Sequence, residues 1–220
     1  MWTFHLTLLF SVTQFISGGY VDKGVLISRN YLVDHLPTWS PTWYVSFQVQ
    51  PIHKIAHWTN VVRFTAGTQD FKRVGDRVPA VFFVPHTTKL HICTTLNNHV
   101  NYCFNSHPLP LHQWASVEIS QTQSAAKYLY TIRINGRTVH QVENKGARYY
   151  MGVNVFRGDN FYGPAPARIR QLTYHNLPSV FKLVRNTIIV ANVKSMIIMF
   201  FVLIVQSMVL VDLMIKTTEL

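Results

Sequence analysis

The chain has 220 residues; 48% of them are hydrophobic, only 13% are charged, and the formal net charge is +11. This length predicts one domain with a sizeable core, and the positive surplus favours polyanionic partners. The sequence contains no P-loop, no GxSxG motif and no Cys/His spacing typical of zinc sites. The usual nucleotide-hydrolysing, α/β-hydrolase and zinc-finger classes are therefore excluded.

The N-terminal segment has the pattern of a secretory signal. Residues 6–16 form an uncharged apolar run, and Ser17, Gly18 and Gly19 then supply the small residues that cleavage needs. This pattern predicts a signal peptide over residues 1–19, with cleavage near Tyr20. The alternative interpretation is that the run forms a first core strand.

The middle of the chain shows the alternation of half-buried strands. In residues 43–49 the odd positions are apolar, and residues 115–120 repeat this alternation. Residues 61–65 and 80–84 are shorter strand candidates. Because no helical apolar stripe of useful length occurs here, the pattern predicts an all-β sandwich or barrel over residues 20–180.

Cys93 and Cys103 flank a polar stretch that contains Asn97 and Asn98. The two cysteines could join the strands of a hairpin by a disulfide, which the oxidising conditions outside the cell would favour. The alternative is a pair of free buried thiols, which would apply if the chain is not secreted.

The clearest turn signal is Asn135-Gly136, which lies between two strand-like segments. Both residues tolerate a positive φ, as a two-residue type I′ hairpin turn requires. In the register that this turn sets, we expect Ile132 to lie opposite Val139 as an apolar cross-strand pair.

The C-terminal region contains a second apolar run. Residues 196–211 include no charged side chain, and Lys194 and Asp212 bracket them. A helix that crosses a bilayer needs about 20 apolar residues, with a lower limit near 17. We predict a C-terminal hydrophobic helix over residues 195–215 that anchors the chain in a membrane; the alternative is a C-terminus that packs elsewhere.

Four segments follow one another in a suggestive order: WASVEI at 114–119, YTIRING at 130–136, VNVFRGD at 153–159 and PAPARIRQL at 164–172. Their order and spacing resemble laminin G-like and concanavalin A-like lectin domains. The resemblance implies a two-sheet antiparallel jelly-roll sandwich that binds glycans or proteins at the cell surface. It also implies a rim loop that can hold calcium; Asp76 and Asp159 are the nearest metal candidates, and no cofactor is certain.

The binding candidates come from residues that combine arginine with aromatic rings. Arginine pairs with sulfate or carboxylate groups, and aromatic faces stack on sugar rings. The loop of residues 158–162 and its neighbours therefore supply the first candidates, and the arginines that flank the predicted hairpin tip supply two more: Arg157, Asp159, Asn160, Tyr162, Arg133 and Arg137.

We do not expect an enzyme. Glycoside hydrolysis needs two carboxylates about 5–9 Å apart, and neither Glu118 nor Glu143 has an acidic residue at a suitable spacing. We expect an extracellular module, secreted or on the outer face of the plasma membrane, that binds a glycan, in particular an anionic one, or a glycan-bearing protein. Nucleic acid is not an expected partner. The alternative function is a structural adhesion or receptor ectodomain that binds a protein partner without carbohydrate specificity.

Overall fold

The computed structural model describes residues 24–177, and the regular structure among them consists of β-strands. Within this range no helix is long and apolar enough to cross a membrane. The predicted signal peptide (1–19) and the predicted hydrophobic helix (195–215) lie outside the described residues.

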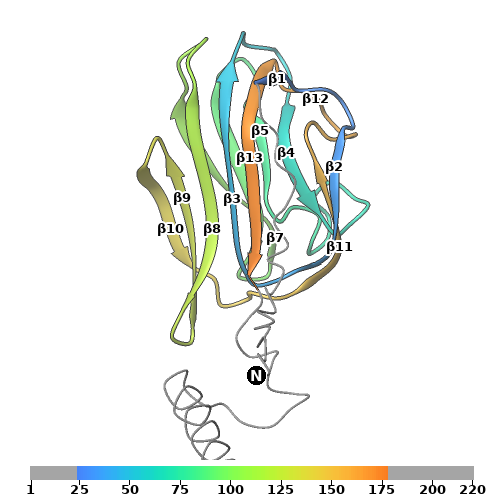
Figure 1. Ribbon diagram of the computed structural model, residues 1–220, viewed down its shortest axis with the longest axis vertical. Coiled ribbons are helices and arrows are strands. Elements are labelled where there is room, and N and C mark those ends of the chain that lie inside the picture. The colour runs from blue at the N-terminus through green and yellow to red at the C-terminus, as the bar shows by residue number, and fades with distance from the viewer. Residues whose placement is uncertain (1–23, 178–220) are drawn as a thin grey trace, which may run out of the picture. The chain divides into compact units, whose positions relative to one another are not determined.

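The first sheet has six antiparallel strands (Figure 1). Their spatial order is β1 (Val25–Leu26), β13 (Ala167–Leu177), β3 (Thr42–Pro51), β8 (Ala115–Ser124), β9 (Lys127–Ile134) and β10 (Arg137–Glu143).

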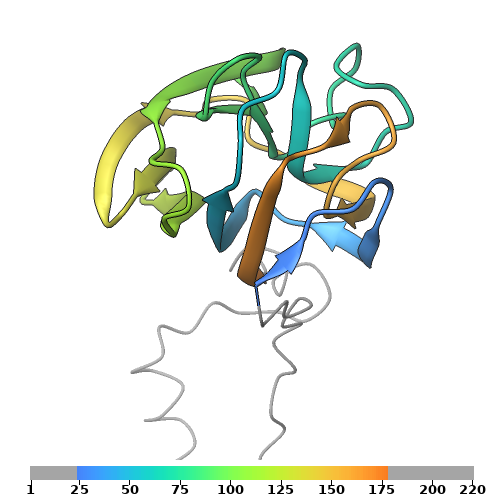
Figure 2. The same cartoon turned by 90° about the horizontal axis from the view of Figure 1, so that it is seen from above.

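The second sheet has seven strands and lies face to face with the first, as the two views together show (Figures 1 and 2). It is antiparallel except for the two-residue β12, which pairs in parallel with β4. The spatial order of the other six strands is β2 (Leu32–Trp39), β11 (Tyr150–Phe156), β4 (Thr59–Thr65), β5 (Ala80–Phe83), β6 (Lys89–Leu96) and β7 (His99–Pro108), and β12 is Gly163–Pro164.

The core lies between the sheets because apolar residues alternate along the strands. In β3 the odd-numbered residues are buried and the even-numbered ones are half-buried, as the sequence pattern predicts. Aromatic rings from both sheets meet in this core: Trp39 packs against Phe64 with ring centroids 5.1 Å apart, and Phe64 meets Tyr174 edge-on at 5.3 Å. The predicted two-sheet antiparallel sandwich is therefore confirmed.

The predicted disulfide is confirmed. Cys93 and Cys103 are directly paired on the adjacent strands β6 and β7 and are bonded at an S–S distance of 2.13 Å. The turn between these strands contains Asn97 and Asn98, both with positive φ, as a tight hairpin requires.

The predicted turn at Asn135-Gly136 is also confirmed, with φ values of 50° and 75°. The predicted partner of Ile132 is wrong, however, because Ile132 pairs with His140 and not with Val139. The ladder shifts between Thr138 and His140, so Val139 is the extra residue of a β-bulge. A bulged residue has no partner on the opposite strand, and Val139 is 39% exposed.

Candidate functional site

The candidate site lies on the face of the seven-stranded sheet that points away from the core. Side chains alternate between the two faces of a strand, so the residues next to the buried Phe83, Leu90 and Ile92 face outward. Phe82 on β5 and His91 on β6 are two such residues, and their Cα atoms are paired in the sheet.

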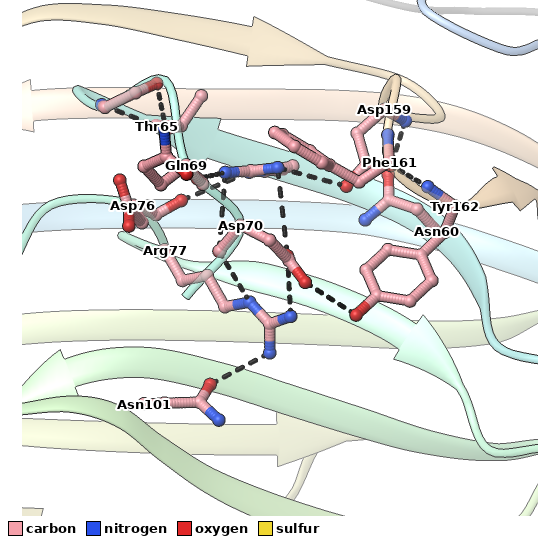
Figure 3. A network of polar contacts seen from close by, with 12 residues as sticks. Asn60, Thr65, Gln69, Asp70, Asp76, Arg77, Asn101, Asp159, Phe161 and Tyr162 are labelled. Carbon is pink, nitrogen blue, oxygen red and sulfur yellow. Dashed lines mark hydrogen bonds and ion pairs between the residues drawn. The ribbon is translucent and has the colours of Figure 1, made fainter. Parts of the chain in front are cut away.

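Two loops lie against this outer face and bring polar groups to it. The first, residues 66–79, connects β4 to β5 and contains Asp70 and Arg77; the second, residues 157–162, connects β11 to β12 and contains Tyr162. Figure 3 shows these side chains turned toward one another.

Asp70 holds the two loops together. Its Oδ1 accepts a hydrogen bond from Nη2 of Arg77 at 2.7 Å, and its Oδ2 accepts one from the Tyr162 hydroxyl at 2.6 Å. Arg77 in turn donates from Nη1 to Oδ1 of Asn101 on β7 at 2.9 Å. These charge-assisted contacts fix the orientation of four side chains that come from three separate parts of the sequence (Figure 3).

Arg63 on β4 forms the buried part of the same network. Its guanidinium is 1% exposed, donates from Nε to the Asp76 carbonyl at 3.1 Å, and pairs with Asp159 Oδ2 at 3.4 Å. Burial lowers the pKa of Arg63 from its ordinary value, and the charges of Asp159 and Asp70 oppose that shift. Burial likewise raises the pKa of Asp159, which the backbone N–H of Tyr162 and the Arg63 charge oppose.

A hollow of about 160 Å³ opens beside this network. Trp58 and Phe71 at its edge are 36% and 44% exposed, so part of each side chain is free to meet a ligand. Arg77 lies over the Phe82 ring at 4.5 Å and near the Phe71 ring at 5.2 Å. The full lining of this hollow, named here the outer-face hollow, is Trp58, Phe71, Arg77, Phe82, His91, Asn101 and Tyr162.

His91 is held at the base of the outer-face hollow. Its ring lies 4.8 Å from the Trp58 ring, and its Nδ1 is 2.6 Å from Oδ1 of Asn105. Burial lowers the pKa of His91, and the nearby Arg77 charge acts in the same direction. His91 also lies close to the sulfurs of Cys93 and Cys103, but with both sulfurs in the disulfide they have no thiolate to offer a metal ion.

The predicted loop residues separate into different environments. Tyr162 lines the outer-face hollow, whereas Asp159 is fully buried and its Oδ1 accepts the backbone N–H groups of Phe161 and Tyr162. Arg157 is buried, with its guanidinium over the Tyr31 ring at 4.1 Å. Asn160 is exposed and offers its carbonyl to Arg29.

Arg133 and Arg137 do not line the outer-face hollow. Both lie on the β9–β10 hairpin of the other sheet, where Arg133 is 3.9 Å from Oε2 of Glu118. The structure therefore does not gather the predicted binding residues into one site.

The calcium candidates Asp76 and Asp159 differ in their contacts with Arg63: Asp159 pairs with the guanidinium through its carboxylate, whereas Asp76 accepts from it only through the backbone carbonyl. One further oxygen of Asp76 accepts the backbone N–H of Arg73 at 2.7 Å. The other carboxylate oxygen of Asp76, Oδ1, is buried and has no hydrogen-bond partner among the described residues, and calcium needs six to eight oxygen ligands. Arg63 compensates the carboxylate of Asp159 but not that of Asp76, and calcium binding stays a prediction.

Most of the residues that line the outer-face hollow were not predicted. Trp58, Phe71, Arg77, His91 and Asn101 carry no motif in the sequence, and their proximity depends on strand pairing and on the loop of residues 66–79. The usable signal was the length of that loop, since a long connection between two short strands often carries function.

Comparison with known proteins gives similarities of structure only. No family model and no curated protein matches the chain. A SAP-like pentraxin from Limulus polyphemus is 12% identical over 74% of this chain and 77% of its own, with a TM-score of 0.46. The receptor-binding domain of botulinum neurotoxin type G is 10% identical over 74% of this chain and 44% of its own, also with a TM-score of 0.46.

A PL7 alginate lyase, AlyA1 from Zobellia galactanivorans, is 14% identical over 63% of this chain and 65% of its own, with a TM-score of 0.44. All three TM-scores lie below 0.5, so the fold rests on the strand order and register described above. Those two properties confirm the two-sheet antiparallel sandwich that the sequence resemblance implied.

Proposed function

We propose that the chain is an extracellular lectin-like module and that it binds a glycan at the outer-face hollow. The observation that carries the proposal is the convergence, at one hollow, of partly exposed aromatic rings and fixed hydrogen-bonding side chains. Sugar rings present C–H groups that pack on aromatic faces and hydroxyls that need directed partners. Trp58 and Phe71 supply the first kind of surface, and Asn101 and His91 supply the second.

The size of the hollow limits the ligand. Its volume of about 160 Å³ is well below the roughly 300–1,000 Å³ of sites that enclose drug-sized molecules. It therefore suits one sugar ring at the end or along the side of a glycan, with the rest of the glycan on the surface. Because the chain carries a net charge of +11, we expect anionic glycans to be preferred, with an affinity that falls as salt rises.

A glycan array on the full-length chain tests the proposal. We expect binding that free sugar competes away and that Trp58→Ala weakens at least tenfold, because the exposed stacking surface is removed. Tyr44→Ala is the matched control, since Tyr44 also stacks on a histidine, His175, but lies on the six-stranded sheet. An array without signal, together with co-purification of one specific protein, would replace the glycan proposal with that of a protein-binding ectodomain.

The chain is proposed to bind and not to cleave its ligand. One structurally similar protein is an alginate lyase. Alginate is therefore the substrate to test first. We expect the full-length chain to release no unsaturated product from alginate, as measured by ultraviolet absorbance. Product release would overturn the expectation, and His91, whose lowered pKa favours the neutral ring, would be the first candidate for the general base.

A further inference from the structure

A second and larger cavity, of about 910 Å³, lies between β7 and the β9–β10 hairpin. It is separate from the outer-face hollow, because the two share no lining residue. This edge cavity is lined by β7 and the segment that follows it, by the hairpin tip and by one residue of β6: Phe104, Asn105, Ser106, His107, Pro108, Leu109, Pro110, Ile134, Asn135, Arg137, Val139 and Lys89.

The edge cavity forms where the outermost strands of the two sheets meet and then separate. His140 on β10 contacts β7 of the other sheet: its Nε2 is 3.0 Å from the Tyr102 hydroxyl, and its ring stacks on Phe104 at 5.0 Å. In Figure 2 the yellow-green hairpin curves around this side of the sandwich. The cavity lies on the side of the His140 contact toward the hairpin turn, as its lining residues Asn135 and Arg137 show.

The wall of the edge cavity is mostly apolar. Phe104, Leu109 and Ile134 contribute from three strands or segments, and the bulge adds Val139. Val139, the extra residue of the bulge, is 39% exposed. The bulge thus places an aliphatic side chain at a hollow where a bound apolar group would remove it from water.

The charges at the edge cavity have one sign. Lys89 and Arg137 line it, and none of its lining residues is acidic. Among the described residues neither of these two cations forms an ion pair, whereas Arg63, Arg77 and Arg133 each have a carboxylate partner. Two uncompensated cations beside an apolar wall are complementary to a ligand that is apolar along its body and negative at one end.

We infer that the edge cavity binds an amphiphilic anion, namely a molecule with a flexible or flat apolar body and a single carboxylate, sulfate or phosphate head. The apolar body lies against Phe104, Leu109 and Val139, and the head group pairs with Arg137 and Lys89. The cavity volume falls within the range of sites that enclose such molecules. This site is independent of glycan binding, because it uses none of the residues of the outer-face hollow.

Three amphiphiles with the same apolar chain test the inference by isothermal titration calorimetry on the full-length protein, below their micelle concentrations. We expect dodecanoate to bind with one site per chain, and dodecanol and dodecyltrimethylammonium to bind at least tenfold more weakly. Equal affinity for the three amphiphiles would overturn the inference, because it would show an apolar surface that does not select for a negative head group.

Substitutions then locate the site. Arg137→Gln is expected to weaken dodecanoate at least tenfold, and Val139→Asp, at an already exposed position, to weaken it further by placing a negative charge in the cavity. Arg133→Gln is the matched control, since Arg133 lies on the same hairpin but outside the cavity and pairs with Glu118. The assignment of the site to the edge cavity would be contradicted if Arg137→Gln and Val139→Asp both bound dodecanoate as the wild type does. Their melting temperatures must also lie near that of the wild type.

A competition experiment distinguishes the two sources of such an anion. Dodecanoate is bound first, and vesicles of phosphatidylglycerol are then added. Displacement by these vesicles, and not by vesicles of phosphatidylcholine, identifies the head group of an anionic membrane lipid as the natural ligand type, and retention of dodecanoate identifies a free anion.

Discussion

Arg63 is the buried cation that contacts both loops of the outer face. It is 1% exposed, and Asp159, its ion-pair partner, is fully buried. Removing one member of a buried ion pair leaves the other charge without compensation, which usually costs about 3–5 kcal/mol. Replacement by methionine retains most of the apolar stem and removes the charge together with the hydrogen bonds that the guanidinium donates to the carbonyls of Gln69, Asp70 and Asp76.

We therefore predict that Arg63→Met lowers the free energy of unfolding by about 3–5 kcal/mol, as measured by urea denaturation. Arg133→Gln serves as the control, because its pair with Glu118 is exposed and exposed pairs contribute about 0–1 kcal/mol. Equal losses in the two variants would show that the buried network contributes no more than a surface contact.

Two partly buried histidines, His91 and His140, are expected to make the stability of the fold depend on pH. Burial lowers the pKa of both His91 and His140 in the folded chain. The unfolded chain therefore binds protons more readily, and its histidines titrate near pH 6.5. Stability contributed by the neutral rings is complete above about pH 6.5 and is lost as the pH falls below it through the folded-state values.

Thermal melts between about pH 7.5 and pH 5 measure this effect. We expect the melting temperature to fall across that interval, and the fall to be shallower in His140→Gln, which retains a polar side chain opposite Tyr102 but cannot be protonated. Parallel curves for the wild type and His140→Gln would exclude His140 as a contributor.

At the scale of the strands, the disulfide gives the most direct prediction. Cys93 and Cys103 close a short loop between β6 and β7, and the restriction of so small a loop in the unfolded chain is worth about 3 kcal/mol. We expect the double variant Cys93→Ser with Cys103→Ser to lose about that much free energy of unfolding. Wild-type protein that has been reduced should match the double variant; unchanged stability after reduction would contradict the prediction.

The strands also show what a sequence can and cannot predict. β3, β8 and the β9–β10 turn were predictable, because regular alternation and Asn135-Gly136 are local signals. β2 was missed, since its exposed and buried residues do not alternate regularly. The bulge at Val139 was missed for a different reason: its local sequence also fits an unbulged hairpin, and contacts with the other sheet accompany the shift.

The outer-face hollow could not be predicted either, because it also depends on contacts between residues that are distant in the sequence. Its polar residues are spread from Arg77 to Tyr162, and they meet through pairing of distant strands and through Asp70. Of the residues chosen from sequence, only Tyr162 lies at the outer-face hollow and only Arg137 at the edge cavity. Arginine and aromatic content indicated the right chemistry but not the right neighbours.

At the scale of the whole molecule, the buried network around Arg63 leads to a prediction about metal ions. The guanidinium of Arg63 supplies the positive charge beside the Asp159 carboxylate. We predict that chelation by EDTA and addition of millimolar calcium both leave the melting temperature of the full-length chain unchanged. A rise with calcium that EDTA reverses would contradict this prediction and reopen the search for an oxygen ligand set.

The bulge has a consequence for how this hairpin can change in length. Thr138 pairs with Arg133 and His140 pairs with Ile132, so the pairs on both sides of Val139 are already in the register of an uninterrupted ladder. Deleting the single codon for Val139 would keep every one of those pairs and would leave His140 on Tyr102. We therefore expect the hairpin to gain or lose this residue without a change of register. The edge cavity would then acquire or lose the Val139 side chain at its edge in one genetic step.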